Sequence, residues 1–160
     1  MMRPGIILFA AAFALAAAPV LAEVAPGTAV RADPQKVARL YAGKTDLWGG
    51  DCGGGIYLSP QMEARAWCAA SPEAFAAGRW SVDTQGRLCH TLSWYWPDGG
   101  KTGSGEPETS CVEHVEDSRG RIWRRWPGDP KWWPLQRTDR PVSGYKYKRR
   151  VAAARAAAGI

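Results

Sequence analysis

Short segments of alternating apolar and polar residues, separated by turn residues, fill most of the chain after Lys44 and constrain its fold more than any other feature. Regular short strands with turn signals between them are typical of antiparallel all-β folds. Candidate strands occupy residues 55–59, 62–68, 78–83, 87–96, 109–116, 121–127 and 131–137. The pattern predicts an all-β fold, in which an antiparallel meander of about seven strands forms a small barrel or a strongly curved sheet.

A short helix is predicted before these strands. Asp33 is suited to cap a helix that begins at Pro34, and Gly43 is suited to end it. The apolar residues between them recur three and four positions apart, as on one helix face: Val37, Leu40 and Tyr41. We expect this helix to pack on the sheet as a small plug or lid.

The segment RLCHTLSWYW, residues 87–96, concentrates side chains that could form either a site or a core. Side chains alternate between the two faces of a strand, so Cys89 and its two neighbours in the sequence point to opposite faces. The opposite face carries more apolar bulk and is expected to point to the core: Leu88, His90, Leu92, Trp94 and Trp96.

A disulfide between Cys89 and Cys111 fits one hairpin register. If these cysteines face each other, the numbers of opposed residues sum to 200, and the connection is centred on Gly100 in the glycine-rich loop 97–108. Leu88 then faces Val112, which is an apolar pair on the core side. Turn position, core pairing and disulfide geometry agree, so this pairing is predicted.

The residue numbers of the other two cysteines, Cys52 and Cys68, sum to 120, which centres the connection between them on Pro60. A second disulfide is therefore predicted across an earlier hairpin. A zinc site is the competing interpretation of four cysteines. The chain has no C-x-x-C motif, and 15, 20 and 21 residues lie between successive cysteines, which is poor spacing for zinc. We expect no metal and no cofactor.

The two histidines are not expected to share a metal ion either. In the predicted register His90 faces Ser110, and His114 lies four residues further along its strand. That separation is roughly 14 Å at ~3.4 Å per residue. Each histidine is predicted to be a hydrogen-bonded residue of the core or its rim.

The N-terminus has the features of a targeting segment. Arg3 precedes an apolar run over residues 6–18, and small residues stand at Val20 and Ala22. We predict a signal peptide over residues 1–22 that is cleaved after Ala22, and a periplasmic location, where disulfides form. A flexible leader (23–34), a single β domain (35–140) and a basic tail that is helical or disordered (141–160) are expected to follow.

Charge is distributed unevenly. Residues 23–118 contain 8 basic and 13 acidic residues, a net charge of −5, whereas residues 119–160 contain 12 basic and 2 acidic residues, a net charge of +10. Such a bias suggests an anionic partner for the C-terminal part. For an exported protein we expect an envelope component or an acidic protein, with peripheral membrane contact through the basic tail, and no nucleic acid. A solvated basic face explains the same bias.

The segment RIWRRWPGDPKWW, residues 121–133, places tryptophans among basic residues. Aromatic faces beside cations suit stacking on a flat ligand or contact with an anionic interface. Stacking of the chain's own arginines on its tryptophans fits the pattern equally well. The predicted contact residues are Trp123, Arg124, Arg125, Trp126, Trp132 and Trp133.

The leading hypothesis from these residues is a non-enzymatic exported domain that binds its partner through this Trp/Arg segment. One alternative is a lipocalin-like carrier, whose barrel interior would be lined by Trp80, Leu92 and Trp94. A second is a small secreted hydrolase using paired carboxylates. The carboxylates near the second hairpin are Glu106, Glu108, Glu113, Glu116 and Asp117.

The order of several motifs resembles a known family. The motifs are LYAGKTDLW (40–48), GGGIYLSP (53–60), AAGRWSVDTQGRLCHTLSW (76–94), CVEHV (111–115), RIWRRW (121–126) and KWWPL (131–135). In this order the chain resembles the small exported alphaproteobacterial proteins of the domain-of-unknown-function family DUF995. The resemblance spans about residues 38–136.

What the resemblance implies is limited, because the family has no established activity, ligand or catalytic residues. It supports the pairing of Cys89 with Cys111, which match the family cysteines. Asp46 stands where the family usually has tryptophan, and Cys52 and Cys68 look like additions.

Overall fold

The computed structural model of this chain describes residue 25, residues 27–136 and residues 140–160. The signal peptide predicted for residues 1–22 lies outside the described residues. The elements are β1 (Val30–Arg31), α1 (Pro34–Tyr41), β2 (Lys44–Trp48), β3 (Gly54–Leu58), β4 (Glu63–Trp67), β5 (Phe75–Val82), β6 (Leu88–Asp98), β7 (Lys101–Ser104), β8 (Glu108–Glu116), β9 (Ile122–Arg125), β10 (Trp133–Pro134), β11 (Val142–Ser143) and α2 (Lys148–Ala157). Within the residues that the structure describes, neither helix has the length and apolar character that a membrane span requires.

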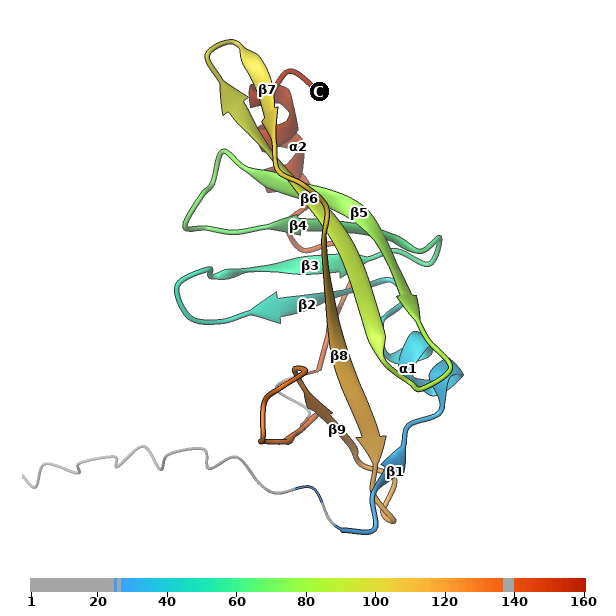
Figure 1. The fold of residues 1–160 in the computed structure, drawn as a ribbon. Coiled ribbons are helices and arrows are strands. Elements are labelled where there is room, and N and C mark those ends of the chain that lie inside the picture. The colour runs from blue at the N-terminus through green and yellow to red at the C-terminus, as the bar shows by residue number, and fades with distance from the viewer. Residues whose placement is uncertain (1–24, 26, 137–139) are drawn as a thin grey trace, which may run out of the picture.

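The strands form one antiparallel, strongly curved sheet (Figure 1). Its order is β10-β9-β8-β6-β5-β4-β3-β2-β11, with β1 beside β8 and β7 beside β6. The predicted all-β antiparallel class is confirmed, in its curved-sheet form. The described residues contain eleven strands where about seven were predicted, because β1, β2, β7 and β11 lie in segments without a clear alternating pattern.

Helix α1 has the predicted boundaries and covers one face of the sheet. The Asp33 carboxylate accepts a hydrogen bond from the backbone N–H of Lys36 at 2.7 Å, which caps the helix, and Pro34 occupies its first turn. Val37 and Tyr41 are buried against sheet residues that include Leu58. Burial of such side chains contributes about 1.5–3 kcal/mol each.

Alternation along β5 produces two hydrophobic clusters on opposite faces. Ala76 and Trp80 belong to the cluster under α1. Phe75 lies on the other face, in a cluster with three residues of the C-terminal helical segment: Val151, Ala154 and Ala158. The α1 cluster and the α2 cluster therefore lie on opposite faces of β5. Figure 1 shows the two helices near opposite ends of the sheet.

Residues 141–160 are part of the domain and not a tail outside it. Val142 of β11 pairs with Thr45 of β2, and the Tyr145 ring stacks on Tyr57 with centroids 4.4 Å apart. Of the two predicted conformations for this segment, the helical one is present. The predicted flexible leader is also partly ordered, because Val30 and Arg31 form β1 and pair with β8.

The predicted register at the centre of the sheet is confirmed. Cys89 pairs with Cys111 and Leu88 with Val112 across β6 and β8, and a disulfide joins the two cysteines. The predicted glycine-rich loop contains a further strand, because β6 turns back through Gly99–Gly100 into β7 before β8 begins. The outer end of β6 extends past the core, which leaves Trp96 38% exposed on the face predicted to be buried.

The first hairpin has its predicted disulfide but a register shifted by two residues. Gly55 pairs with Trp67, so opposed numbers sum to 122 rather than 120. The turn contains Met62 at φ +62°, a left-handed conformation that few side chains adopt and that the sequence does not signal. Cys52 and Cys68 join just beyond the end of this ladder.

Candidate functional site

Three strands bring charged side chains to one face near the end of β8. Val115 pairs with Arg31 of β1, and Glu113 pairs with Arg125 of β9. Directly paired residues project to the same face, as do residues two positions apart on a strand. Arg31, Glu113, Val115 and Arg125 therefore share a face although they are distant in the sequence.

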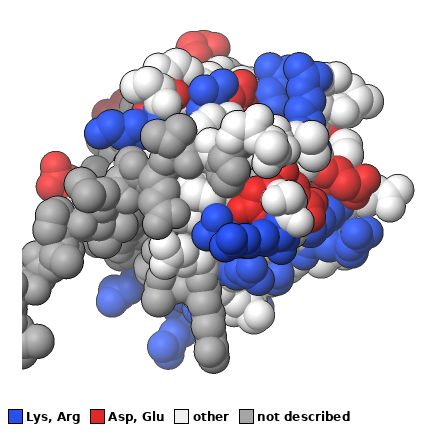
Figure 2. Space-filling view, turned by 90° about the horizontal axis from the view of Figure 1, so that it is seen from below, with Lys and Arg blue, Asp and Glu red and all other residues white. Residues whose placement is uncertain are grey.

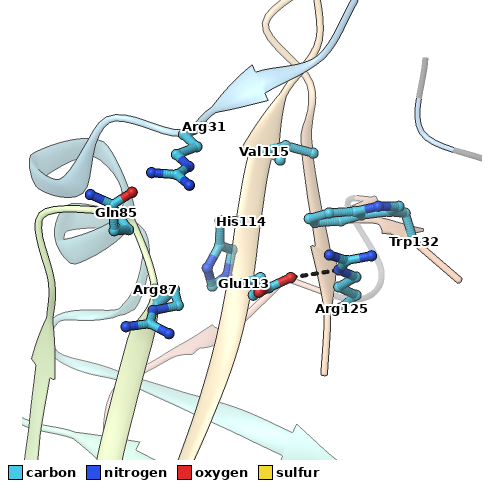
Figure 3. A pocket seen from close by; sticks show the side chains of 8 residues that line it. All are labelled: Arg31, Gln85, Arg87, Glu113, His114, Val115, Arg125 and Trp132. Carbon is cyan, nitrogen blue, oxygen red and sulfur yellow. Dashed lines mark hydrogen bonds and ion pairs between the residues drawn. The ribbon is translucent and has the colours of Figure 1, made fainter. Parts of the chain in front are cut away.

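A cavity of about 320 Å³ lies among these side chains. The turn between β5 and β6 adds Gln85 and Arg87 to its wall, and Trp132, which precedes β10, adds an indole ring. In Figure 3, Gln85 and Arg87 lie on one side of β8, and Trp132 lies on the other. The volume is within the range of small-ligand sites.

Arg125 is held in place from two sides. Its Nε donates a hydrogen bond to the Glu113 carboxylate at 2.5 Å, and its guanidinium lies 4.4 Å from the centroid of the Trp132 ring. A guanidinium has five N–H donors, so this contact with Glu113 leaves others free to bind a ligand. Glu113 and Trp132 thus fix the orientation of the Arg125 guanidinium.

The cavity carries an excess of positive charge. Its wall contains three arginines and one carboxylate, that of Glu113, which is already paired with Arg125. Arg87 forms an ion pair with Asp83, a residue outside the wall, at 2.7 Å. Within the described part of the chain, Arg31 forms no ion pair. In Figure 2, basic side chains border a smaller acidic group on the face seen from below.

A buried polar network lies behind the cavity. The His114 ring is 2% exposed, and its Nε2 lies 2.8 Å from the Tyr41 hydroxyl. On the neighbouring strand β9, Arg124 donates to both carboxylate oxygens of Asp46, at 3.0 and 3.2 Å. These contacts join α1, β2, β8 and β9 through the interior of the curved sheet.

Burial controls the protonation of this network. Desolvation lowers the pKa of His114 to about 4, and the nearby Arg124 charge acts in the same direction. Desolvation raises the pKa of Asp46, and the Arg124 charge opposes that change. Near neutral pH the imidazole is therefore uncharged, and the positive charge of the cavity comes from its arginines.

The six predicted contact residues do not form one surface. Trp123 is 1% exposed and its Nε1 donates to Asp117 at 3.1 Å, so its prediction as a contact residue is wrong. Arg124 is directed to Asp46 in the interior. Only Arg125 and Trp132 line the cavity. The remaining two, Trp126 and Trp133, do not line this cavity.

Trp123 was misplaced because basic neighbours in the sequence suggested exposure. Alternation on β9 places Trp123 on the face opposite Arg124, together with its β8 partner Val115. On that face the Arg121 guanidinium lies 5.1 Å from the centroid of the Trp123 ring, and Asp117 accepts the hydrogen bond from its Nε1. Sequence reasoning also missed Arg31 and Arg87 as site residues. Arg31 lies in the predicted leader and reaches the cavity through the pairing of β1 with β8. Arg87 follows a turn and directly precedes β6, which pairs with β8 on its other side.

Three of the five carboxylates considered for a hydrolase are engaged in ion pairs, and the other two, Glu106 and Glu108, are exposed. Glu113 pairs with Arg125, and Glu116 pairs with Lys36 at 2.5 Å. Burial raises the pKa of Asp117, but hydrogen bonds from Arg121 outweigh that effect and hold the pKa well below its usual range. A general acid needs a raised pKa, so this environment does not favour that role.

The histidines are separated as the register predicts. His90 pairs with Ser110, whereas His114 pairs with Arg124 further along β8. His114 is hydrogen-bonded in the core, as predicted, but the Nδ1 of His90 is buried without a partner in the described structure. Within residues 27–136 and 140–160, no group of three or more metal-ligating side chains is gathered.

Comparison with known proteins identifies a family for this chain. A family model described as "Protein of unknown function (DUF995)" matches residues 6–150. Neither the curated proteins nor the solved structures contain a match to this chain.

Proposed function

Because this chain belongs to the DUF995 family, whose description assigns no activity, we propose from the site alone that the protein is a non-enzymatic domain that binds an anionic group. The observation that carries this proposal is the convergence of Arg31, Arg87 and Arg125 on one cavity. Planar guanidinium groups recognise carboxylate and phosphate oxygens through paired hydrogen bonds. The ligand we propose is the phosphate or carboxylate group of an envelope component.

An exported location is part of the proposal. Two disulfides, Cys52–Cys68 and Cys89–Cys111, are typical of proteins in oxidising compartments. The apolar run over residues 6–18 fits a signal peptide and thus a periplasmic protein. Anionic lipid headgroups and acidic glycans of the envelope would then be accessible partners.

The two alternatives receive less support. In the carrier hypothesis Trp80 and Leu92 line a ligand cavity, but both are buried in the cluster under α1. Trp94, the third proposed lining residue, borders a cavity at the outer end of β6. The hydrolase hypothesis loses support from the ion pairs of Glu113 and Glu116.

Titration with anions tests the proposal. Inorganic phosphate and vesicles of phosphatidylglycerol are the two probes, and phosphatidylcholine vesicles are the neutral comparison. Calorimetry should show saturable binding of phosphate that weakens with added salt. Arg31→Gln should weaken it about tenfold or more, because hydrogen bonds to a charged group are lost.

Arg119→Gln is the matched variant, since Arg119 is an exposed arginine that does not line the cavity. It removes the same charge and should leave phosphate affinity within about twofold of wild type, as expected for a distant screened charge. Equal losses in both variants would show non-specific attraction to a basic surface and would refute the cavity as the site. Binding of vesicles without free phosphate would assign the ligand to lipid headgroups.

A further inference from the structure

A second cavity, of about 360 Å³, lies between the outer end of β6 and the connection from β4 to β5. It shares no lining residue with the arginine cavity. Its wall is formed by Cys68, Ser71, Glu73, Ala74, Trp94 and Trp96. None of these residues has a role in the function proposed above.

One wall of this cavity is aromatic and is supported from behind. Trp94 and Trp96 are two positions apart on β6 and so project to the same face. Trp96 pairs across the hairpin with Gly103 of β7. A Cβ atom at Gly103 would lie 2.4 Å from the Trp96 Nε1, so the indole rests directly on the backbone of β7. The absence of a side chain at Gly103 is what allows this position of the ring.

The facing wall is the loop of residues 68–74, which one disulfide and two hydrogen bonds hold in shape. The Cys52–Cys68 disulfide fastens its first residue, and the backbone N–H of Ala69 donates to the Cys52 carbonyl at 2.7 Å. Further on, the Trp67 Nε1 donates to the Pro72 carbonyl at 3.1 Å. The cavity is therefore formed before a ligand arrives, which reduces the entropic cost of binding.

The charge of this cavity is opposite to that of the arginine cavity. Glu73 is the one charged residue in its wall, and within the described residues its carboxylate forms no ion pair. The faces of indole rings also carry negative electrostatic potential and attract cations. A single carboxylate is too few ligands to hold a metal ion, and the largely apolar wall suits a cation that carries alkyl groups.

We infer that this cavity binds an organic ammonium group, with Trp94 and Trp96 contacting its alkyl groups and Glu73 balancing its charge. This inference does not depend on the anion site. The two sites lie on different parts of the sheet, and each can be tested in a variant that removes the other. The combination of aromatic faces and one carboxylate is the arrangement that recognises alkylated ammonium groups in general.

The probe is choline, and its uncharged carbon analogue 3,3-dimethylbutan-1-ol is the comparison. The two molecules have nearly the same shape, so a difference in affinity reports the charge. Titration followed by tryptophan fluorescence and by amide chemical shifts of β6 should show saturable choline binding in the millimolar range. The neutral analogue should bind about tenfold more weakly, since a desolvated cation–π contact is worth about 1–2 kcal/mol.

Glu73→Gln and Trp96→Ala should each reduce choline affinity about fivefold or more. Trp126→Ala is the matched variant, because Trp126 is 44% exposed, close to the 38% of Trp96, and lines neither cavity. It should bind choline as the wild type does. Arg31→Gln should also retain choline binding, which separates this inference from the anion site.

Several results would overturn the inference. Equal affinity for the neutral analogue would show that the cavity selects apolar shape and not charge. Unchanged choline binding in Glu73→Gln would remove the carboxylate from the site. Since Glu73 is exposed, that variant is expected to fold even if Trp96→Ala does not. Circular dichroism of each variant checks the fold before binding is measured.

Discussion

The buried imidazole of His114 makes the stability of the domain depend on pH. Its pKa is lowered from 6.5 to about 4 in the folded chain, so the unfolded chain binds more protons between these values. The stabilisation is complete above pH 6.5 and is lost as the pH falls toward 4. The two pKa values correspond to roughly 3 kcal/mol of free energy of unfolding. Urea unfolding measured between pH 7 and pH 5 should show this decline.

The His114→Gln variant identifies the source of that pH dependence. It keeps a polar group near Tyr41 but cannot titrate, so the decline between pH 7 and pH 5 should become shallower. His90, whose pKa burial also lowers, contributes in the same direction, and Asp46, whose pKa burial raises, contributes in the opposite one. Both remain in the variant, so the difference from wild type isolates His114. An unchanged slope would contradict the assignment.

Two tryptophans three positions apart should respond very differently to the same substitution. Trp123→Ala removes a side chain that is 1% exposed and leaves a cavity in the core, so we expect a loss of about 3–5 kcal/mol in the free energy of unfolding. Trp126→Ala removes a side chain that is 44% exposed, and we expect a change within about 0.5 kcal/mol. Chemical denaturation of both variants measures the contrast. If both variants lost a similar free energy of unfolding, the exposed position of Trp126 in the fold would be contradicted.

At the scale of elements, helix α2 is a structural layer of the domain. Ala154 is 2% exposed and packs with Val151 and Ala158 on the face of the sheet that α1 does not cover. Ala154→Lys forces a long charged side chain into this contact and should lower the free energy of unfolding by about 2 kcal/mol. Ala153→Lys adds the same charge at the neighbouring exposed position and should change it by about 0.5 kcal/mol or less.

The comparison of these two variants distinguishes a packed helix from a detached tail. If residues 141–160 did not pack on the sheet, Ala154→Lys and Ala153→Lys would be equally harmless in urea or thermal unfolding. A loss confined to Ala154→Lys supports the packing of α2 on β4, β5 and β6. Helical content, measured by circular dichroism, should be the same in both because lysine is a good helix former.

Elements with several agreeing local signals could be predicted from the sequence. The cap at Asp33, the proline at Pro34 and the apolar spacing together predicted α1. The register of β6 and β8 followed from Cys89, Cys111 and the turn between them. Each conclusion rested on interactions between residues near in sequence or joined by a covalent constraint.

Elements that depend on distant partners could not be predicted. β1 and β11 are two residues long, and their strand conformation comes from pairing with β8 and β2. A segment this short has no periodicity of its own. The candidate site could be predicted only in part for the same reason. Arg31 enters it through the pairing of β1 with β8 and was not predicted. Arg125 was predicted because it lies in segment 121–133, where tryptophans stand among basic residues.

At the scale of the whole molecule, β8 joins two parts of the curved sheet. Its first half pairs with β6, and its second half, which carries the arginine cavity, is flanked by β1 and β9. The Cys89–Cys111 disulfide lies where β6 and β8 pair. The Cys52–Cys68 disulfide lies at the end of the β3–β4 hairpin. The two bonds therefore constrain different parts of the molecule.

Removing each disulfide should cost similar stability but alter different regions. Cys89 and Cys111 are 22 positions apart in the sequence, and Cys52 and Cys68 are 16 positions apart, so either Cys→Ser pair should lower the free energy of unfolding by about 3 kcal/mol. Hydrogen exchange should then accelerate along β8 and β9 when Cys89 and Cys111 are replaced. It should accelerate around residues 68–74 when the other pair is replaced, and choline binding should weaken in that variant alone. The same pattern of hydrogen exchange in both variants would contradict the conclusion that the two disulfides constrain different parts of the molecule. It would mean that the sheet opens as one unit whichever disulfide is removed.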